Sequence, residues 1–159
     1  MDGKNVCLAA DIDKGLAKPG KKVIVVGGGL TGTETAITLA REGHEVLVMD
    51  LLPMKEIIAR DKMMRKAQKL ALQEGVVFKE EFRLKSITPT GLIGEEKDGT
   101  EVELTCDTVA LSLGVRSRKA VVEALEGVCG EMYWAGDCVL RQGNIRTAVR
   151  DGFYAAMNV

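Results

Sequence analysis

The fold is decided by residues 21–32, which read KKVIVVGGGLTG. Residues 23–26 form a continuous β-branched run, which is typical of a parallel strand buried on both faces. The run breaks at a glycine, and the pattern over 30–41 is helical and ends before Gly43. Residues 45–50 then predict a second strand. The segment is therefore a strand-helix-strand unit with the right-handed crossover of a parallel sheet.

The glycines after the first strand match the G-x-G-x-x-G pattern of loops that bind the pyrophosphate of a dinucleotide. In this pattern Gly27 permits a tight turn, Gly29 lets the backbone approach the pyrophosphate, and Gly32 lets the helix pack closely on the strand. Free amides at the helix start face the phosphates, assisted by the positive end of the helix dipole. A glycine-rich turn that only packs is the alternative, but the strand before it and the helix after it favour binding. The predicted contacts are Gly27, Gly28, Gly29, Leu30, Thr31 and Gly32.

A carboxylate ends the second predicted strand. Asp50 is placed where an acidic side chain accepts hydrogen bonds from the adenosine ribose hydroxyls. It would repel a 2′-phosphate, and Leu51 and the two residues after it supply no cation. Lys55, Arg60 and Arg65 lie further along and keep NADP(H) open as the alternative. We therefore predict NAD(H), with Asp50 and Leu51 in contact with it.

The rest of the chain predicts alternating strands and helices. A helix is expected at 56–74 and a strand at 76–78. Short alternating runs separated by turn residues predict antiparallel hairpins, at 82–87, 91–93 and 101–104. The remaining expected elements are a buried strand at 107–113, a helix at 120–125, a strand at 131–135 and a helix at 145–157.

These elements predict an α/β protein with a Rossmann-like, three-layer NAD(P)-binding domain that combines a parallel sheet and an antiparallel β-meander. We expect residues 1–20 to be a connector, 21–115 to be the NAD(H)-binding domain and 116–159 to be a return segment.

The composition argues against several partners. Lys and Arg number 22 against 23 Asp and Glu, without long runs of either sign, so no nucleic-acid surface is expected. The apolar runs are far shorter than the roughly 20 residues of a membrane span, and the first residues lack a signal-peptide pattern. We therefore expect no membrane contact and a cytoplasmic location.

Cysteine and histidine offer little chemistry. The four cysteines contain no C-x-x-C pair and are expected to be free thiols, with Cys138 packed as a buried small residue rather than acting as a redox thiol. His44 is the single histidine and is expected in a connecting turn, so no metal site is predicted.

A second group of polar residues lies near the end of the chain. Gly136 and Asp137 follow the strand expected at 131–135, and Asn144 is placed to be the N-cap of the last helix. An aspartate beside a glycine at a strand end suits a polyol hydroxyl or a bound ion. A capped structural turn is equally compatible with these residues.

The chain resembles the C-terminal part of the NADH:flavin oxidoreductases related to old yellow enzyme, such as 2,4-dienoyl-CoA reductase and 2-enoate reductase. The resemblance is carried by residues 27–36, 49–53, 110–114 and 135–138. It implies that Gly114 lies beside the dinucleotide and that Glu34 lies near the interface of nicotinamide and flavin. It also implies that Gly136 and Asp137 hold part of an FAD, and that the last helix aims its N-terminus, at Asn144 and Ile145, toward the flavin.

In that family an FMN-binding barrel with an iron–sulfur cluster precedes an FAD domain, which the NAD(P)H domain interrupts. Hydride passes from the nicotinamide to FAD, and electrons continue through the cluster to FMN and a substrate double bond. This chain has one glycine fingerprint, and its cysteines do not fit a cluster spacing. The resemblance therefore implies an NAD(H) domain flanked by parts of an FAD domain, namely the connector at 1–20 and the return segment at 116–159.

The function implied is delivery of hydride from NADH to FAD, for reduction of an enoate or enoyl-CoA double bond elsewhere in a full-length flavoenzyme. The expected partners are NADH and the FAD and FMN-barrel portions of the same protein; FMN and the cluster are not expected to bind here. The isolated chain is expected to be inactive and to contain no catalytic residue. A stand-alone NADH-binding sensor or scaffold module is the alternative. A piece of a glutathione reductase-like enzyme is a third possibility, but that class requires an active-site cysteine pair, and this sequence contains none.

Overall fold

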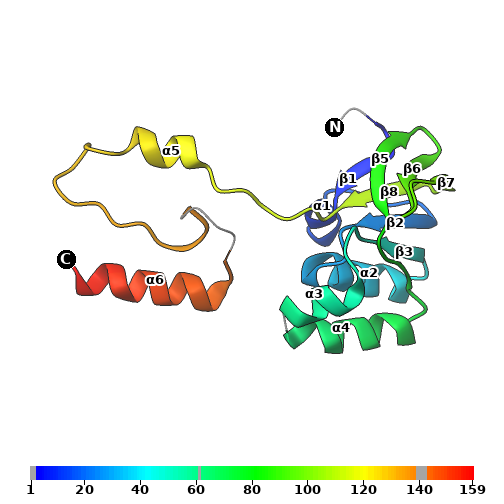
Figure 1. The fold of residues 1–159 in the computed structure, drawn as a ribbon, viewed down its shortest axis with the longest axis horizontal. Coiled ribbons are helices and arrows are strands. Elements are labelled where there is room, and N and C mark those ends of the chain that lie inside the picture. Colours follow the sequence, from blue (N-terminus) through cyan, green and yellow to red (C-terminus); the bar gives the residue numbers. More distant parts are fainter. Residues whose placement is uncertain (1–2, 61, 139–142) are drawn as a thin grey trace. The chain divides into compact units, whose positions relative to one another are not determined.

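The computed structural model describes residues 3–60, 62–138 and 143–159, and these divide into two compact units, Met1–Leu113 and Gly114–Val159 (Figure 1). The first unit is built on a five-stranded parallel sheet with strand order β1-β8-β2-β3-β4. Its strands are β1 (Val6–Leu8), β8 (Thr108–Leu111), β2 (Lys22–Val26), β3 (Glu45–Met49) and β4 (Val77–Lys79). The α/β class and the parallel sheet predicted from the sequence are confirmed.

Strand β2 runs through the middle of the sheet and is buried from Val23 to Val26. Its side chains alternate between two cores, as the period of two in a strand requires. Val23 and Val25 belong to the core under the helices α2 (Leu30–Arg41) and α4 (Lys62–Gln73). Ile24 and Val26 belong to the core on the opposite face. Both faces of β2 are therefore covered, which explains its continuous apolar sequence.

The opposite face of the sheet is covered by an antiparallel three-stranded meander of β5 (Arg83–Thr88), β6 (Gly91–Glu95) and β7 (Glu101–Thr105). Phe82 and Leu92, which are almost fully buried, join Ile24, Met49 and Val109 in the core between meander and sheet. Helices, parallel sheet and meander are thus the three predicted layers, visible in Figure 1.

Two of the expected boundaries in this unit differ from the structure. The helix expected at 56–74 is replaced by α3 (Met54–Arg60) and α4, on either side of residue 61, which lies outside the described residues. The segment expected as a connector at 1–20 contributes the edge strand β1, which pairs with β8, and the short helix α1 (Ala9–Asp13). Residues 6–10 are apolar because Val6 and Ala9 pack in the unit, a signal too short to be separated from a linker.

The second unit contains α5 (Lys119–Ala124), a 3₁₀ turn η1 (Gly136–Cys138) and α6 (Ile145–Met157). The two helices agree with the sequence, but the strand predicted at 131–135 is wrong, because these residues are irregular. A strand needs a neighbour to complete its hydrogen bonds, and the described part of this unit contains none. None of the described residues of α5 or α6 is buried. Within the described ranges, no helix combines the length and apolar character needed to cross a lipid bilayer.

Candidate functional site

The glycine loop lies at the carboxyl edge of three adjacent strands. The Gly27 amide donates to the carbonyl of Met49 on β3 over 2.8 Å, and the Ser112 amide, just after β8, donates to the carbonyl of Val26 over 2.8 Å. Gly27 has φ of +108°, a backbone conformation that L side chains rarely adopt. A Cβ added at Gly27 would lie 2.3 Å from the Ser112 carbonyl oxygen. The first glycine is therefore required both by its conformation and by the closeness of the neighbouring strand.

The third glycine of the pattern, Gly32, lies in the first turn of α2 and is buried. A Cβ added there would lie 2.0 Å from the carbonyl oxygen of Gly27 and 3.1 Å from the side chain of Ser112. The role predicted for Gly32, close packing of helix against strand, agrees with this geometry.

Gly29, between these two, is different. It is exposed, its backbone is extended, and no atom lies within 4 Å of a Cβ added to it. It is also the N-cap of α2, and no side chain caps the helix. An α-helix leaves its first amide groups without partners inside the helix, so the start of α2 offers donors beside an open position. This is the arrangement that binds phosphate at a helix N-terminus.

Two threonines of α2 stabilise the start of the helix, one by a bond to the glycine loop and one by a bond to α1, and sequence reasoning did not identify them. Thr33 is fully buried, and its hydroxyl donates to the carbonyl of Gly28 over 3.2 Å. The Thr35 hydroxyl lies 3.0 Å from both the Thr31 carbonyl and the carboxylate of Asp13 on α1. The sequence carries one signal for these contacts: two hydroxyl residues on the buried face of a predicted helix, where a polar group requires a hydrogen-bond partner.

Asp50 follows β3, and both of its carboxylate oxygens are engaged. Oδ2 accepts from the Gly28 amide over 2.7 Å, and Oδ1 accepts from the Leu52 amide over 2.8 Å. Each oxygen can accept more than one hydrogen bond, so the carboxylate keeps capacity for a ligand hydroxyl. Asp50 thus joins the glycine loop to the chain that leaves β3, and the predicted ribose contact remains a prediction.

The remaining residues of the predicted set fall into two groups. In the first unit, Leu51 and Glu34 are exposed, whereas Leu30 is partly buried against the cluster formed by Met54, Ile57 and Met64. Part of the Leu30 side chain is therefore used in packing, while its backbone lies at the start of α2. The structure brings Gly27 to Gly32 together with Asp50 and Leu51. Gly114, Gly136, Asp137, Asn144 and Ile145 belong to the second unit, which is described by itself.

In the second unit, Asp137 and Asn144 organise the approach to α6. The Asp137 carboxylate accepts from the Gly143 amide over 3.0 Å. The predicted N-cap is confirmed: Asn144 Oδ1 accepts from the Thr147 amide over 3.1 Å, and Thr147 Oγ1 accepts from the Asn144 amide over 2.8 Å. This reciprocal capping box fixes the start of the helix, while the side chain of Ile145 is almost fully exposed.

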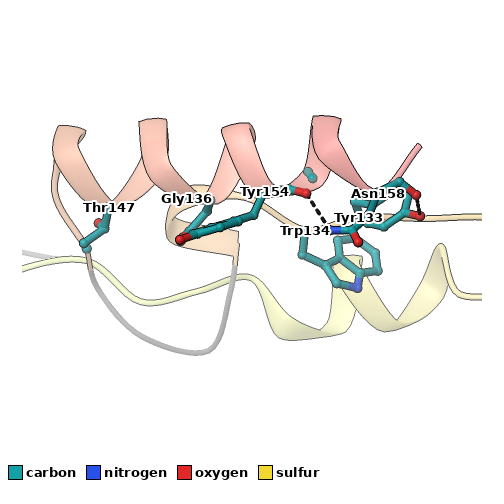
Figure 2. A pocket seen from close by; sticks show the side chains of 9 residues that line it. Tyr133, Trp134, Gly136, Thr147, Tyr154 and Asn158 are labelled. Atoms are coloured by element: carbon teal, nitrogen blue, oxygen red, sulfur yellow. Dashed lines mark hydrogen bonds between the residues drawn. The ribbon is translucent and has the colours of Figure 1, made fainter.

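A cavity of about 310 Å³ lies between α6 and the segment that precedes η1. Figure 2 shows that Tyr133, Trp134 and Tyr154 gather on it, with Gly136, Thr147 and Asn158 along its length. The Tyr133 hydroxyl donates to the Asn158 carbonyl, and the side-chain amide of Asn158 donates to the Tyr154 carbonyl over 2.7 Å. The first bond ties the irregular segment, where sequence reasoning expected a strand, to the C-terminal end of α6, and the second lies within that end of the helix.

The cysteines and the histidine provide no reactive centre in the described residues. All four cysteines are free, as predicted, but Cys138 is only partly buried, and its thiol donates to the Ala135 carbonyl over 2.9 Å. Burial raises the pKa of the Cys106 thiol, and burial followed by the charge of Asp11 raises that of Cys7, so both stay protonated at neutral pH. His44 lies in the predicted turn, with Nδ1 2.7 Å from the Gly20 carbonyl oxygen. The arrangement can bind an anionic ligand but carries no evident nucleophile.

A parallel sheet with a glycine loop at its carboxyl edge and an uncapped helix behind it defines a dinucleotide-binding domain of the Rossmann type. Residues 3–152 match the family model described as pyridine nucleotide-disulphide oxidoreductase. The chain belongs to this family, whose members are oxidoreductases that bind NAD(P)H and FAD.

Curated relatives include the bilirubin reductase of Mediterraneibacter gnavus, 34% identical over 143 residues, which cover 87% of this chain and 21% of that protein. The NADH oxidase of Thermoanaerobacter brockii is 30% identical over 146 residues, which cover 87% of this chain and 21% of that protein. The chain therefore spans about a fifth of the length of these relatives.

Among solved structures, a 2-naphthoyl-CoA reductase matches with a TM-score of 0.82 and 24% identity, over 99% of this chain and 24% of that one. At this identity the match shows the fold alone. It supports the predicted fold class.

Proposed function

We propose that this chain is the NAD(H)-binding part of a flavin-dependent oxidoreductase and that it presents NADH to an FAD held by the rest of a longer protein. The observation that carries the proposal is the bond between the Gly28 amide and Asp50, which couples the phosphate loop to the carboxylate placed for the ribose. When bound, the nicotinamide supplies a hydride. The residues of this chain bind and orient the nucleotide, and none of them takes part in a covalent step.

The second unit supports a partner in the same protein. The helix α6 carries Ile145, Val149, Phe153 and Met157 at intervals of four residues, and each is at least 60% exposed. Such a stripe is the face by which a helix packs into a core, yet none of the described residues of α6 is buried. We infer that α6 packs against the FAD-binding remainder, and that the isolated chain is inactive.

The substrate that we propose for the full enzyme rests on the family resemblance. By that resemblance the electrons reduce an enoate or enoyl-CoA double bond, in an enzyme that also carries FMN and an iron–sulfur cluster in its barrel. The names of two similar proteins, a bilirubin reductase and a 2-naphthoyl-CoA reductase, are compatible with reduction of a conjugated carbon skeleton.

The test is calorimetric titration of the isolated chain with NADH, NADPH and FAD in separate experiments. We expect NADH to bind more tightly than NADPH. We expect FAD to bind weakly, because FAD requires a second glycine loop of its own and this sequence contains one such loop. Absence of NADH binding at millimolar concentration would refute the proposal.

A second measurement tests the inactivity of the isolated chain. If the chain alone reduced an enoate or an enoyl-CoA with NADH, without added protein or flavin, the proposed division of labour would be wrong.

A further inference from the structure

A second acidic residue, Glu80, lies at the same edge of the sheet as Asp50. It directly follows β4, the neighbour of β3 in the parallel sheet. The Glu80 Oε2 atom accepts from the amide of Met54, the first residue of α3, over 2.8 Å. Asp50 binds the Leu52 amide over 2.8 Å. The two carboxylates therefore hold amides only two residues apart, on the short loop between β3 and α3.

The backbone draws these segments together as well. The Asp50 amide donates to the Lys79 carbonyl over 3.0 Å, and the Phe82 amide donates to the Asp50 carbonyl over 2.9 Å. Residues 79–82 thus wrap around Asp50, and Glu80 lies in the middle of this wrap. The Glu80 side chain is exposed, but the backbone bonds around it and its bond to the Met54 amide restrain its position.

The charge of these two carboxylates is not neutralised by ion pairs in the described part of the chain. The nearby Lys79 pairs with Glu96 over 2.6 Å, and Lys97 pairs with Glu81 over 2.6 Å. Asp50 and Glu80 accept from backbone amides instead. Two residues of chain span at most about 7 Å, and each carboxylate is bonded to its amide over 2.8 Å, so the two carboxylates lie no more than about 13 Å apart. Salt weakens a charge at this range without abolishing its effect, because the Debye length is about 8 Å at physiological ionic strength. The Glu80 charge therefore acts, in part screened, near the place where the glycine loop puts the adenosine ribose.

We propose that Glu80 is a second determinant of nucleotide choice, which fixes the β3–α3 loop through Met54 and repels the 2′-phosphate of NADPH. This inference rests on the proposed function, because it requires the dinucleotide to bind at the glycine loop. A neutral ribose hydroxyl is indifferent to the Glu80 charge at this range, whereas a phosphate is not. Glu80 therefore lowers the affinity for NADPH and leaves the affinity for NADH almost unchanged.

The experiment compares the dissociation constants of NADH and NADPH for the unaltered chain and for Glu80→Gln. Glutamine keeps an oxygen that can accept from Met54 but removes the charge. We expect NADPH to bind about three- to tenfold more tightly to the variant, with NADH binding within about twofold, because one screened charge is removed. The gain should shrink at high salt, which a purely structural effect would not do.

Glu45→Gln is the matched control, because Glu45 is an exposed acid at the opposite end of β3. It also removes one negative charge, but about 17 Å from Asp50, at the far end of the strand. We expect it to leave the ratio of the NADPH and NADH dissociation constants unchanged. Glu80→Ala also removes the bond to Met54 and should weaken both nucleotides.

The outcomes separate the two proposals. If the unaltered chain prefers NADH and Glu80→Gln leaves the ratio unchanged, only the role of Glu80 is wrong. An equal shift in Glu45→Gln, or a gain that does not depend on salt, also overturns it. If the unaltered chain binds neither nucleotide, the proposed function fails and takes the role of Glu80 with it.

Discussion

Replacing Gly32 with alanine tests whether the loop and α2 are packed as closely as the structure indicates. The added Cβ would lie 2.0 Å from the Gly27 carbonyl oxygen and 3.1 Å from the Ser112 side chain. The first obstacle is backbone, so no side-chain rotation relieves it, and either the loop or α2 must shift. Forcing extra volume into a packed site costs about 1–3 kcal/mol, and alanine returns about 1 kcal/mol of helix propensity. Because the obstacle is backbone, the upper end of that range applies, about 3 kcal/mol, and we expect a net loss of about 2 kcal/mol in the free energy of unfolding.

Urea unfolding followed by far-UV circular dichroism is the appropriate assay. Circular dichroism is preferred to tryptophan fluorescence, because the single tryptophan, Trp134, lies in the second unit, whereas α2 belongs to the first. We also expect the displaced loop to weaken NADH binding at least about tenfold, since each 1.4 kcal/mol of lost interaction is a factor of ten. A Gly32→Ala variant that unfolds at the same urea concentration as the unaltered chain and binds NADH equally well would refute the packing argument.

Gly29→Ala is the control, because it adds the same methyl group to the same loop at a position with open space around it. No atom lies within 4 Å of a Cβ at Gly29, and its φ of −66° is open to any residue. We expect a loss of no more than about 1 kcal/mol in stability, because alanine is a poorer N-cap than glycine, while NADH binding still falls, because the methyl group occupies the approach of the pyrophosphate. The two variants together distinguish a loop shaped for packing from one shaped for a ligand.

Three further predictions concern other parts of the molecule. Asp50→Ala leaves the Gly28 and Leu52 amides without their acceptor. We expect at least about tenfold weaker NADH binding by calorimetry, because a hydrogen bond from the ribose to a charged group is worth about 1.5–3 kcal/mol. Unchanged affinity would exclude the ribose role of Asp50. Asn144→Ala removes the capping box of α6 and should cost about 1 kcal/mol of helix stability, seen as lost ellipticity at 222 nm, whereas Gly152→Ala, with open space around its Cβ, should increase it. Burial raises the pKa of the Cys106 thiol above its ordinary value of 9.0. The stability that this thiol contributes in its neutral form is therefore present below pH 9.0 and is lost as the pH rises through the raised pKa. Cys106→Ala should remove this alkaline fall in stability, and an unaltered pH dependence of the free energy of urea unfolding would contradict the prediction.

Much of the first unit could be predicted because its signals are local. Three signals follow one another directly along the chain: the apolar run of β2, the glycines after it and the helix α2. Each element is long enough to show its own repeat of apolar residues. The edge strand β1 could not be separated from a linker, because its three residues depend on pairing with β8, about a hundred residues away in the sequence. Short strands are stabilised by neighbours that the sequence does not mark.

Similar limits apply to the candidate site. Gly27, Gly32 and Asp50 belong to a pattern with known spacing, so their positions could be anticipated. The Thr33 bond to Gly28 and the Glu80 bond to Met54 could not, because they join residues through the folded backbone rather than through a motif. The strand expected at 131–135 failed for a related reason, since its alternating residues find no partner strand in the described part of the second unit.

The two amides held by Asp50 have a consequence for cofactor engineering. A common strategy for converting an NADH enzyme to NADPH is to delete the acidic residue after the second strand. Here that deletion would also release the Gly28 amide and the turn at Leu52. A successful redesign would keep a small acceptor at this position, such as asparagine or serine, and would place the new positive charge elsewhere. The residue that selects the cofactor under the proposed function is also part of the scaffold, and we expect a swap that ignores this to lose both nucleotides together.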